Sequence, residues 1–170
     1  MSEIILRKYH GVGNDYLIFD PKKNDVVLNE RLIRQLCRRN IGVGADGILY
    51  GPVMEDKKIK VRIFNPDGSE AEKSGNGIRI FSRYLKDAGY VKERQYYLTT
   101  KAGETLVTFL DDAGSCMRVD MGYAVFEAEQ IRHLDLREKL WENRYFSATI
   151  FIMRPVYPWE IQIVLLCLRG

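Results

Sequence analysis

The sequence predicts an α+β fold in which antiparallel strands surround one long helix. Short apolar runs of strand composition recur from Ile4 to Met121, and turn residues separate them. One longer amphipathic segment after residue 77 interrupts these runs and carries its apolar side chains on a single helical face. Because the apolar face of a sheet needs a second layer to cover it, we expect the strands to pack around this helix.

The first half of the pattern contains four predicted strands and a short predicted helix. The strands are Ile4–Tyr9, Tyr16–Asp20, Ile48–Tyr50 and Lys60–Phe64. A loop rich in Gly and Asn, His10–Asp15, separates the first two strands. Asn29 can cap a helix that continues through Arg39. The apolar stripe of that helix consists of Leu32, Ile33, Leu36 and Cys37.

The long helix follows the turn Pro66-Asp67-Gly68 and a second glycine-containing loop, Ser74-Gly75-Asn76-Gly77. It ends at Gly89, and its apolar face consists of Ile78, Phe81, Tyr84, Leu85 and Ala88. Three further strands are predicted after it: Tyr96–Thr100, Thr105–Leu110 and Met117–Met121.

Composition favours a soluble protein and excludes several kinds of partner. The 26 Lys and Arg residues are interleaved with 23 Asp and Glu residues, so no basic block indicates nucleic-acid binding. Three widely spaced cysteines, with no CxxC pair or His cluster, predict neither a disulfide framework nor a metal site. The apolar run Ile161–Leu168 is shorter than the roughly 20 residues that cross a bilayer. We therefore expect a cytoplasmic protein without a membrane segment.

One glycine motif matches a dinucleotide-binding pattern but has the wrong context. Gly42-Val43-Gly44-Ala45-Asp46-Gly47 reads G-x-G-x-x-G, which requires a helix directly after it to present its N-terminus to pyrophosphate. The apolar run that follows predicts a strand instead. A dinucleotide site is therefore not expected.

The loop at the start of the long helix is the better candidate site. Unpaired backbone N–H groups and the positive end of the helix dipole make the Ser74-Gly75-Asn76-Gly77 loop suited to holding a carboxylate. The side chain of Ser74 would lie beside that carboxylate, where a base would be useful. Asn14 and Asn65 add amides that can both donate and accept, as recognition of an amino acid requires. The alternative is structural, because Asn and Gly are also the commonest residues of turns and helix caps.

Four motifs, taken together, resemble the amino-terminal half of the diaminopimelate epimerase family. That half is marked by H-G-x-G-N-D, G-V-G-A-D, F-N-x-D-G-S-E and C-G-N-G-x-R. They stand in this sequence, in the same order and spacing, as His10–Asp15, Gly42–Asp46, Phe64–Glu70 and Ser74–Arg79. The resemblance covers about Ile4 to Gly122 and implies one of two pseudo-symmetric halves of the family fold.

The resemblance implies an isomerase of lysine and peptidoglycan-precursor synthesis that interconverts LL- and meso-diaminopimelate. The reaction uses no metal, flavin or pyridoxal phosphate, since two cysteines on opposite sides of the α-carbon transfer its proton. By position, Asn14 and Asn65 are expected to contact the substrate, and Gly75 with Asn76 to bind its carboxylate. The resemblance also implies a small-molecule amino-acid substrate and a homodimer.

Two departures from the family pattern concern the site itself. Ser74 stands where the family has its first catalytic cysteine, and an aliphatic hydroxyl is a far weaker base than a thiolate. Gly47 stands where many members have a glutamine that contacts the substrate. An alternative reading is thus a non-catalytic remnant that binds an amino acid without turnover. Isomerases of the phenazine-type fold and proline racemase match the Asn65 and Ser74 segments less closely.

Domain organisation is predicted to change after the strands. We expect residues 1–122 to form the amino-terminal domain and residues 123–170 a truncated start of the second. From Asn143 to Gly170 only four residues are charged, against 29% of the whole chain. Because at most one half of the paired site is present, we expect little epimerase activity from this chain.

The unusual composition of the tail suggests a shifted reading frame. Read one base earlier, the codons permitted for Tyr157–Val164 can spell S-M-G-N-P-N-C, in which only the glycine is forced. The resembled family carries M-G-N-P in its second half. We hypothesise a frame change between Asn143 and Pro155. The rival reading is a genuine apolar tail that packs on the domain or mediates oligomerisation.

Overall fold

The computed structural model describes residues 3–122 and 162–167 of the chain. Within these ranges the secondary structure consists of two helices and nine strands. In chain order they are β1 (Glu3–Gly11), β2 (Asn14–Phe19), α1 (Glu30–Cys37), β3 (Ile48–Glu55), β4 (Lys58–Phe64), β5 (Glu70–Ala71), α2 (Gly75–Asp87), β6 (Gln95–Thr100), β7 (Gly103–Phe109), β8 (Met117–Val119) and β9 (Gln162–Cys167).

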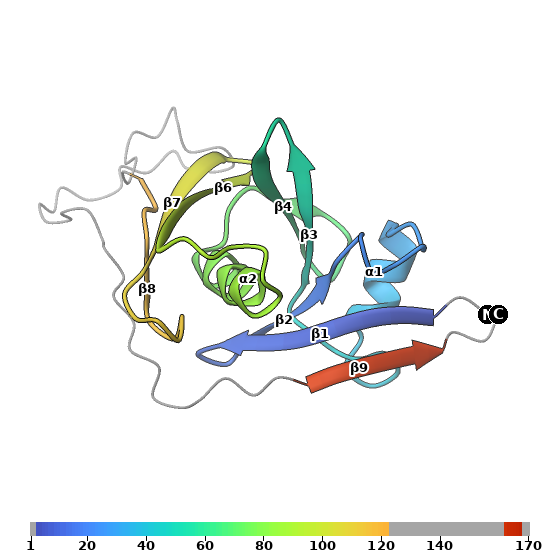
Figure 1. Ribbon diagram of the computed structural model, residues 1–170. Coiled ribbons are helices and arrows are strands. Elements are labelled where there is room, and N and C mark those ends of the chain that lie inside the picture. Colours follow the sequence, from blue (N-terminus) through green and yellow to red (C-terminus); the bar gives the residue numbers. More distant parts are fainter. Residues whose placement is uncertain (1–2, 123–161, 168–170) are drawn as a thin grey trace, which may run out of the picture.

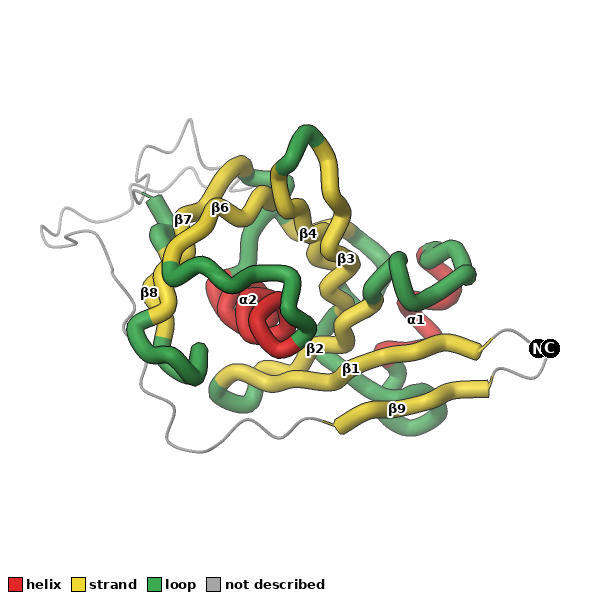
Figure 2. The backbone as a smooth tube through the Cα atoms, in the orientation of Figure 1, coloured by secondary structure: helices red, strands yellow, loops and turns green. Residues whose placement is uncertain are grey.

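The strands form one curved sheet that wraps around α2, as predicted (Figures 1 and 2). The strand order is β8-β7-β6-β4-β3-β2-β1-β9, and the short β5 pairs with β4. In both views α2 lies in the hollow of this sheet, whereas α1 lies outside it. The sheet therefore has an inner face that contacts α2 and an outer face that contacts α1.

The sheet is mixed, so the prediction of antiparallel strands is wrong for two pairings. β2 pairs with β3 in parallel, and β4 pairs with β6 in parallel. A helix separates each of these pairs in the chain: α1 lies between β2 and β3, and α2 between β4 and β6. Because a crossover helix returns the chain to the same end of the sheet, the strands on its two sides run in parallel.

Strand β2 shows how the sequence fills both faces. Tyr16 and Ile18 belong to the apolar cluster around α2, whereas Leu17 and Phe19 belong to the cluster around α1. Side chains of a strand alternate between its two faces, so a strand covered on both faces is apolar at successive positions. This double cover holds β2 firmly in the middle of the fold.

Both helices begin with a side-chain cap, and the one at Asn29 was predicted from the sequence. The Asn29 side chain accepts a hydrogen bond from the backbone N–H of Leu32 at 2.9 Å. The predicted stripe of α1 is buried, but the helix ends at Cys37 because Arg38 is already extended. Ser74 caps α2 in the same way, and Gly89 follows that helix in a left-handed conformation with φ of 74°.

The hairpin β3–β4 is longer than predicted. The predicted strand ended at Tyr50, directly before Gly51-Pro52, and both of these residue types usually weaken a strand. The strand continues to Glu55, with a shift of register between Tyr50 and Val53 that accommodates this pair. Asp56 and Lys57 both have positive φ, as the tightest hairpin turns require.

The tail contributes one strand to the described structure. The β9 backbone pairs antiparallel with β1, with Glu3 opposite Cys167 and Lys8 opposite Gln162. The predicted frame change between Asn143 and Pro155 lies outside the described residues. In the described ranges no helix has the length and apolar character needed to cross a membrane.

Candidate functional site

Three loops that are far apart in the sequence are joined by hydrogen bonds from amide side chains. Asn14, at the β1–β2 turn, donates from Nδ2 to Asp46 Oδ2 at 2.9 Å. Asn76, in the first turn of α2, donates from Nδ2 to Asn14 Oδ1 at 3.2 Å. The guanidinium of Arg79 donates in turn to Asn76 Oδ1. The structure thus brings together the predicted residues Asn14 and Asn76 through these contacts.

This series of bonds fixes which way each amide faces. The oxygen of Asn76 accepts from Arg79 and that of Asn14 accepts from Asn76, so the nitrogen of each amide points toward the next acceptor. An amide nitrogen carries two hydrogens, and each of these nitrogens uses one in the series. The second hydrogen of each remains a donor for a ligand at this place.

A charge cluster holds Asp46 at the end of the series. The side chain of Arg39 donates to both oxygens of Asp15, at 2.7 and 3.1 Å, and to Asp46 Oδ1 at 2.6 Å. Lys8 Nζ lies 2.9 Å from Asp15 Oδ2. Burial of Asp15 opposes its charged form, but the hydrogen bonds from Arg39 and Lys8 outweigh it and hold its pKa well below the usual range.

The lowered pKa of Asp15 predicts that its contribution to stability is lost at low pH. Replacing Asp15 by asparagine should lower the free energy of unfolding at pH 7 by roughly 1 to 2 kcal/mol, because Arg39 and Lys8 lose a charged acceptor but stay partly solvated. A carboxylate whose pKa is lowered by folding stabilises the native state above its unfolded pKa, near 3.9. That contribution is lost as the pH falls toward the folded pKa.

Urea unfolding at pH 7 and at about pH 2.5 measures this effect. The difference between the parent and the Asp15→Asn variant should shrink at the lower pH. The matched control is Asp25→Asn, the same change at an exposed carboxylate, which should shift stability by less than about 0.5 kcal/mol. A difference for Asp15→Asn that is equal at both pH values would contradict the prediction.

Ser74 occupies the N-cap of α2, beside these amides. Its Oγ accepts a hydrogen bond from the backbone N–H of Gly77 at 3.1 Å. Gly75 and Asn76 follow in the first turn, where backbone N–H groups have no acceptor within the helix. Three features of a carboxylate site therefore coincide here: helix donors, the positive end of the dipole and oriented amides.

Asn65 lies apart from this group. It is exposed in the turn between β4 and β5, and its Nδ2 donates to Ser69 Oγ at 2.9 Å. Its backbone N–H also bonds within that turn, to the carbonyl of Ser69 at 2.8 Å. The described hydrogen bonds do not join Asn65 to Asn14, Ser74 or Asn76. Its predicted contact with a substrate therefore stays a prediction.

Tyr16, which contacts Ser74, and Gly47, which lies against the Tyr16 ring, were not among the predicted site residues. The hydroxyl of Tyr16 lies 3.3 Å from Ser74 Oγ, and Tyr16 is buried. A Cβ atom on Gly47 would lie 2.7 Å from Tyr16 Cε1 and 2.4 Å from the carbonyl oxygen of Phe64. This backbone therefore has no room for a side chain at position 47. Because side chains alternate along β2, Tyr16 lies on the face of the sheet that contacts α2, but only the folded structure shows its contact with Ser74.

Within the described residues the thiol of Cys37 does not replace the missing cysteine. It lies on α1, in the apolar cluster of the outer face. Burial raises its pKa to about 11, so the thiol stays protonated near neutral pH and is not available as a base. The described residues also contain no group of three His, Cys, Asp or Glu side chains arranged to hold a metal ion.

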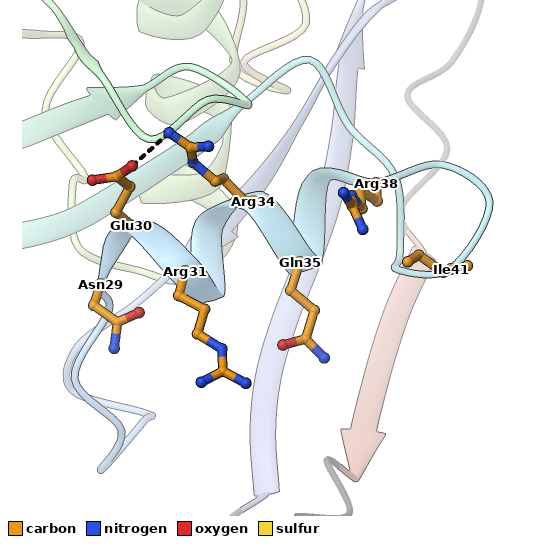
Figure 3. Close-up of a pocket in the computed structure, with 7 residues that line it drawn as sticks. All are labelled: Asn29, Glu30, Arg31, Arg34, Gln35, Arg38 and Ile41. Atoms are coloured by element: carbon orange, nitrogen blue, oxygen red, sulfur yellow. Dashed lines mark hydrogen bonds and ion pairs between the residues drawn. The ribbon is translucent and has the colours of Figure 1, made fainter.

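A cavity of about 810 Å³ lies along the exposed side of α1 (Figure 3). Arg34 pairs there with Glu30 at 2.6 Å, one turn away on the helix. The residues that line it are Asn29, Glu30, Arg31, Arg34, Gln35, Arg38 and Ile41. None of them is a predicted site residue, so this cavity is separate from the loops around Ser74.

Sequence comparison relates most of the chain to one family. A family model described as diaminopimelate epimerase matches residues 6–127. "Diaminopimelate epimerase 2" of Nostoc sp. is 46% identical over 146 residues, which are 85% of this chain and 51% of that protein. The diaminopimelate epimerase of Methanothermobacter thermautotrophicus is 38% identical over 148 residues, 84% of this chain and 51% of that protein. The chain thus spans about half the length of these relatives.

Solved structures confirm the fold. A hydroxyproline epimerase from Agrobacterium vitis aligns with a TM-score of 0.55 at 15% identity, over 71% of this chain and 43% of that chain. A Bacillus anthracis phenazine biosynthesis protein of the PhzF family aligns with a TM-score of 0.53 at 22% identity, over 70% of this chain and 40% of that chain. At these identities the likeness concerns the fold alone.

Proposed function

Because this chain belongs to the diaminopimelate epimerase family, we propose that it supplies the amino-terminal half of an enzyme that interconverts LL- and meso-diaminopimelate. The reaction transfers the α-proton without a cofactor and serves lysine and peptidoglycan-precursor synthesis. The observation that carries this proposal is the meeting of Asn14 and Asn76 beside Ser74 at the N-terminus of α2.

The geometry supports a role for each residue. The backbone N–H groups of Gly75 and Asn76, with the helix dipole, would bind the α-carboxylate. Removal of the α-proton moves negative charge into that carboxylate, and fixed donors stabilise this charge as it develops. Asn14 and Asn76 would orient the amino acid with their remaining amide hydrogens. Ser74 would face the α-carbon from one side, and the other base would come from the second half of the enzyme.

Binding of the amino acid tests this assignment. The Asn76→Asp variant should bind LL-diaminopimelate about a hundredfold more weakly than the parent chain, as measured by isothermal titration calorimetry. The change removes a donor and places a negative charge beside the ligand carboxylate, and a hydrogen bond to a charged group contributes about 1.5 to 3 kcal/mol. Arg79 can still pair with the new carboxylate, so the helix start should stay folded.

The matched control is Asn29→Asp, the same chemical change at the N-cap of α1 on the outer face of the sheet. Aspartate is as good an N-cap as asparagine, so this variant should bind like the parent. Equal affinity of the parent and the Asn76→Asp variant, or absence of binding by the parent, would reject the proposed site.

Ser74 favours a second candidate function, a protein that binds the amino acid without turnover. Serine at this position preserves the N-cap hydrogen bond to Gly77 but has no readily formed anion. Both functions predict binding, and only the epimerase predicts exchange of the α-hydrogen with solvent.

We further infer a cytoplasmic location and a homodimer for the complete enzyme. Amino-acid biosynthesis of this kind supports the first inference, and the family resemblance supports the second. Light scattering of the purified protein measures the second directly.

A further inference from the structure

Two hydroxyl groups from different elements meet at the start of α2. Tyr16 comes from the central strand β2 and is only 7% exposed. Its hydroxyl lies 3.3 Å from Ser74 Oγ, and either oxygen can be the donor. Since the N–H of Gly77 already donates to Ser74 Oγ, a donated bond from Tyr16 would give this oxygen two donors. The hydrogen of Ser74 would then be directed toward a ligand.

We propose that Tyr16 is a positioning residue for proton transfer, which bonds Ser74 Oγ and stabilises its deprotonated form. The proposal rests on the proposed function and deepens it. It names the group that lets a serine stand where the family has a cysteine.

The proton transfer balances with these two residues. When Ser74 acts as the acid, its O–H bond breaks and the electron pair of the α-carbanion forms the new C–H bond. The oxygen of Ser74 keeps its electron pair and is left as an anion, which accepts hydrogen bonds from the Tyr16 hydroxyl and the Gly77 N–H. In the reverse direction this oxygen takes the α-proton, and the electron pair of the broken C–H bond stays on the α-carbon. Donors fixed in place before the reaction stabilise the charge on the oxygen as it develops.

Packing around Tyr16 supports this arrangement. The ring lies against Gly47, where any Cβ would come within 2.7 Å of Tyr16 Cε1. A larger side chain at position 47 and the present position of Tyr16 therefore exclude each other. The opposing strand pairs Tyr9 with Tyr16, and both rings belong to the apolar cluster around α2. The phenol is thus held at a fixed place beside Ser74.

A thiol introduced at position 74 reports on this bond without any substrate. In the Ser74→Cys chain, the rate of alkylation by iodoacetamide at position 74 is measured against pH by peptide mass spectrometry. Adding Tyr16→Phe should move the midpoint of this pH profile upward by about one unit, because the thiolate loses a charge-assisted hydrogen bond. A role of Tyr16 in packing alone would leave the midpoint where it was, since phenylalanine keeps the ring.

Two further variants complete the experiment. Tyr97→Phe removes a hydroxyl from an exposed ring on β6 and should not move the midpoint. Gly47→Ala should displace the Tyr16 ring and raise the midpoint in the same direction as Tyr16→Phe. Equal midpoints with and without the Tyr16 hydroxyl would overturn the proposal. Because no diaminopimelate is used, this result is independent of the binding and exchange measurements that test the proposed function.

Discussion

Exchange of the α-hydrogen of LL-diaminopimelate with D₂O is expected to be about a hundredfold faster in the Ser74→Cys variant than in the parent chain. A thiol forms its anion near neutral pH far more readily than a hydroxyl, and the start of a helix lowers its pKa further. A well-placed base contributes a factor of about 10² to 10⁴. Loss of the α-hydrogen signal in the ¹H NMR spectrum measures the rate. Exchange requires one base, whereas inversion requires two.

The control for this experiment is Ser74→Ala, which should show only background exchange. Both variants lose the N-cap oxygen that bonds Gly77, so each should be less stable by about 1 kcal/mol. Their thermal unfolding therefore has to be compared before the rates are. If Ser74→Cys is as slow as Ser74→Ala, the non-catalytic binding function is the better account.

The second large effect concerns stability and is expected when Phe81, the central aromatic residue of α2, is truncated. Replacing Phe81 by alanine should reduce the free energy of unfolding by about 4 kcal/mol. Phe81 is fully buried between α2 and the inner face of the sheet, and its ring centroid lies 6.0 Å from that of Tyr84. A domain has only about 5 to 15 kcal/mol of stability in total. This one change would remove a large part of it.

Urea denaturation followed by circular dichroism measures this loss. The matched control is Tyr97→Ala, which truncates an aromatic ring that is 61% exposed and should change stability by less than about 0.5 kcal/mol. Similar losses for the two variants would mean that α2 is not the centre of the core.

The elements that the sequence predicts well are those whose signals are local. The cap residue Asn29, the apolar stripe of α1 and the glycine after α2 each act within a few residues. The parallel pairings of β2 with β3 and of β4 with β6 have no local signal, because they depend on where each helix returns the chain. The continuation of β3 through Gly51-Pro52 was missed because pairing with β4 overrides a local strand-breaking signal.

The same distinction applies to the site. The helix start at Ser74 and the amides of Asn14 and Asn76 could be named from the motifs. Their mutual hydrogen bonds could not, since Asn14 and Asn76 are 62 residues apart. Tyr16 was missed for the same reason, being 58 residues from Ser74.

The series of bonds from Arg79 through Asn76 and Asn14 to Asp46 limits which loops can be exchanged between related proteins in a chimera. Each amide is turned by its neighbour, so a new residue at one member changes the direction in which the next presents its free hydrogen. The three loops therefore act as one structural unit. A chimera that takes only one of these loops from a relative with different partners would misorient the other two, even where every single residue is acceptable on its own.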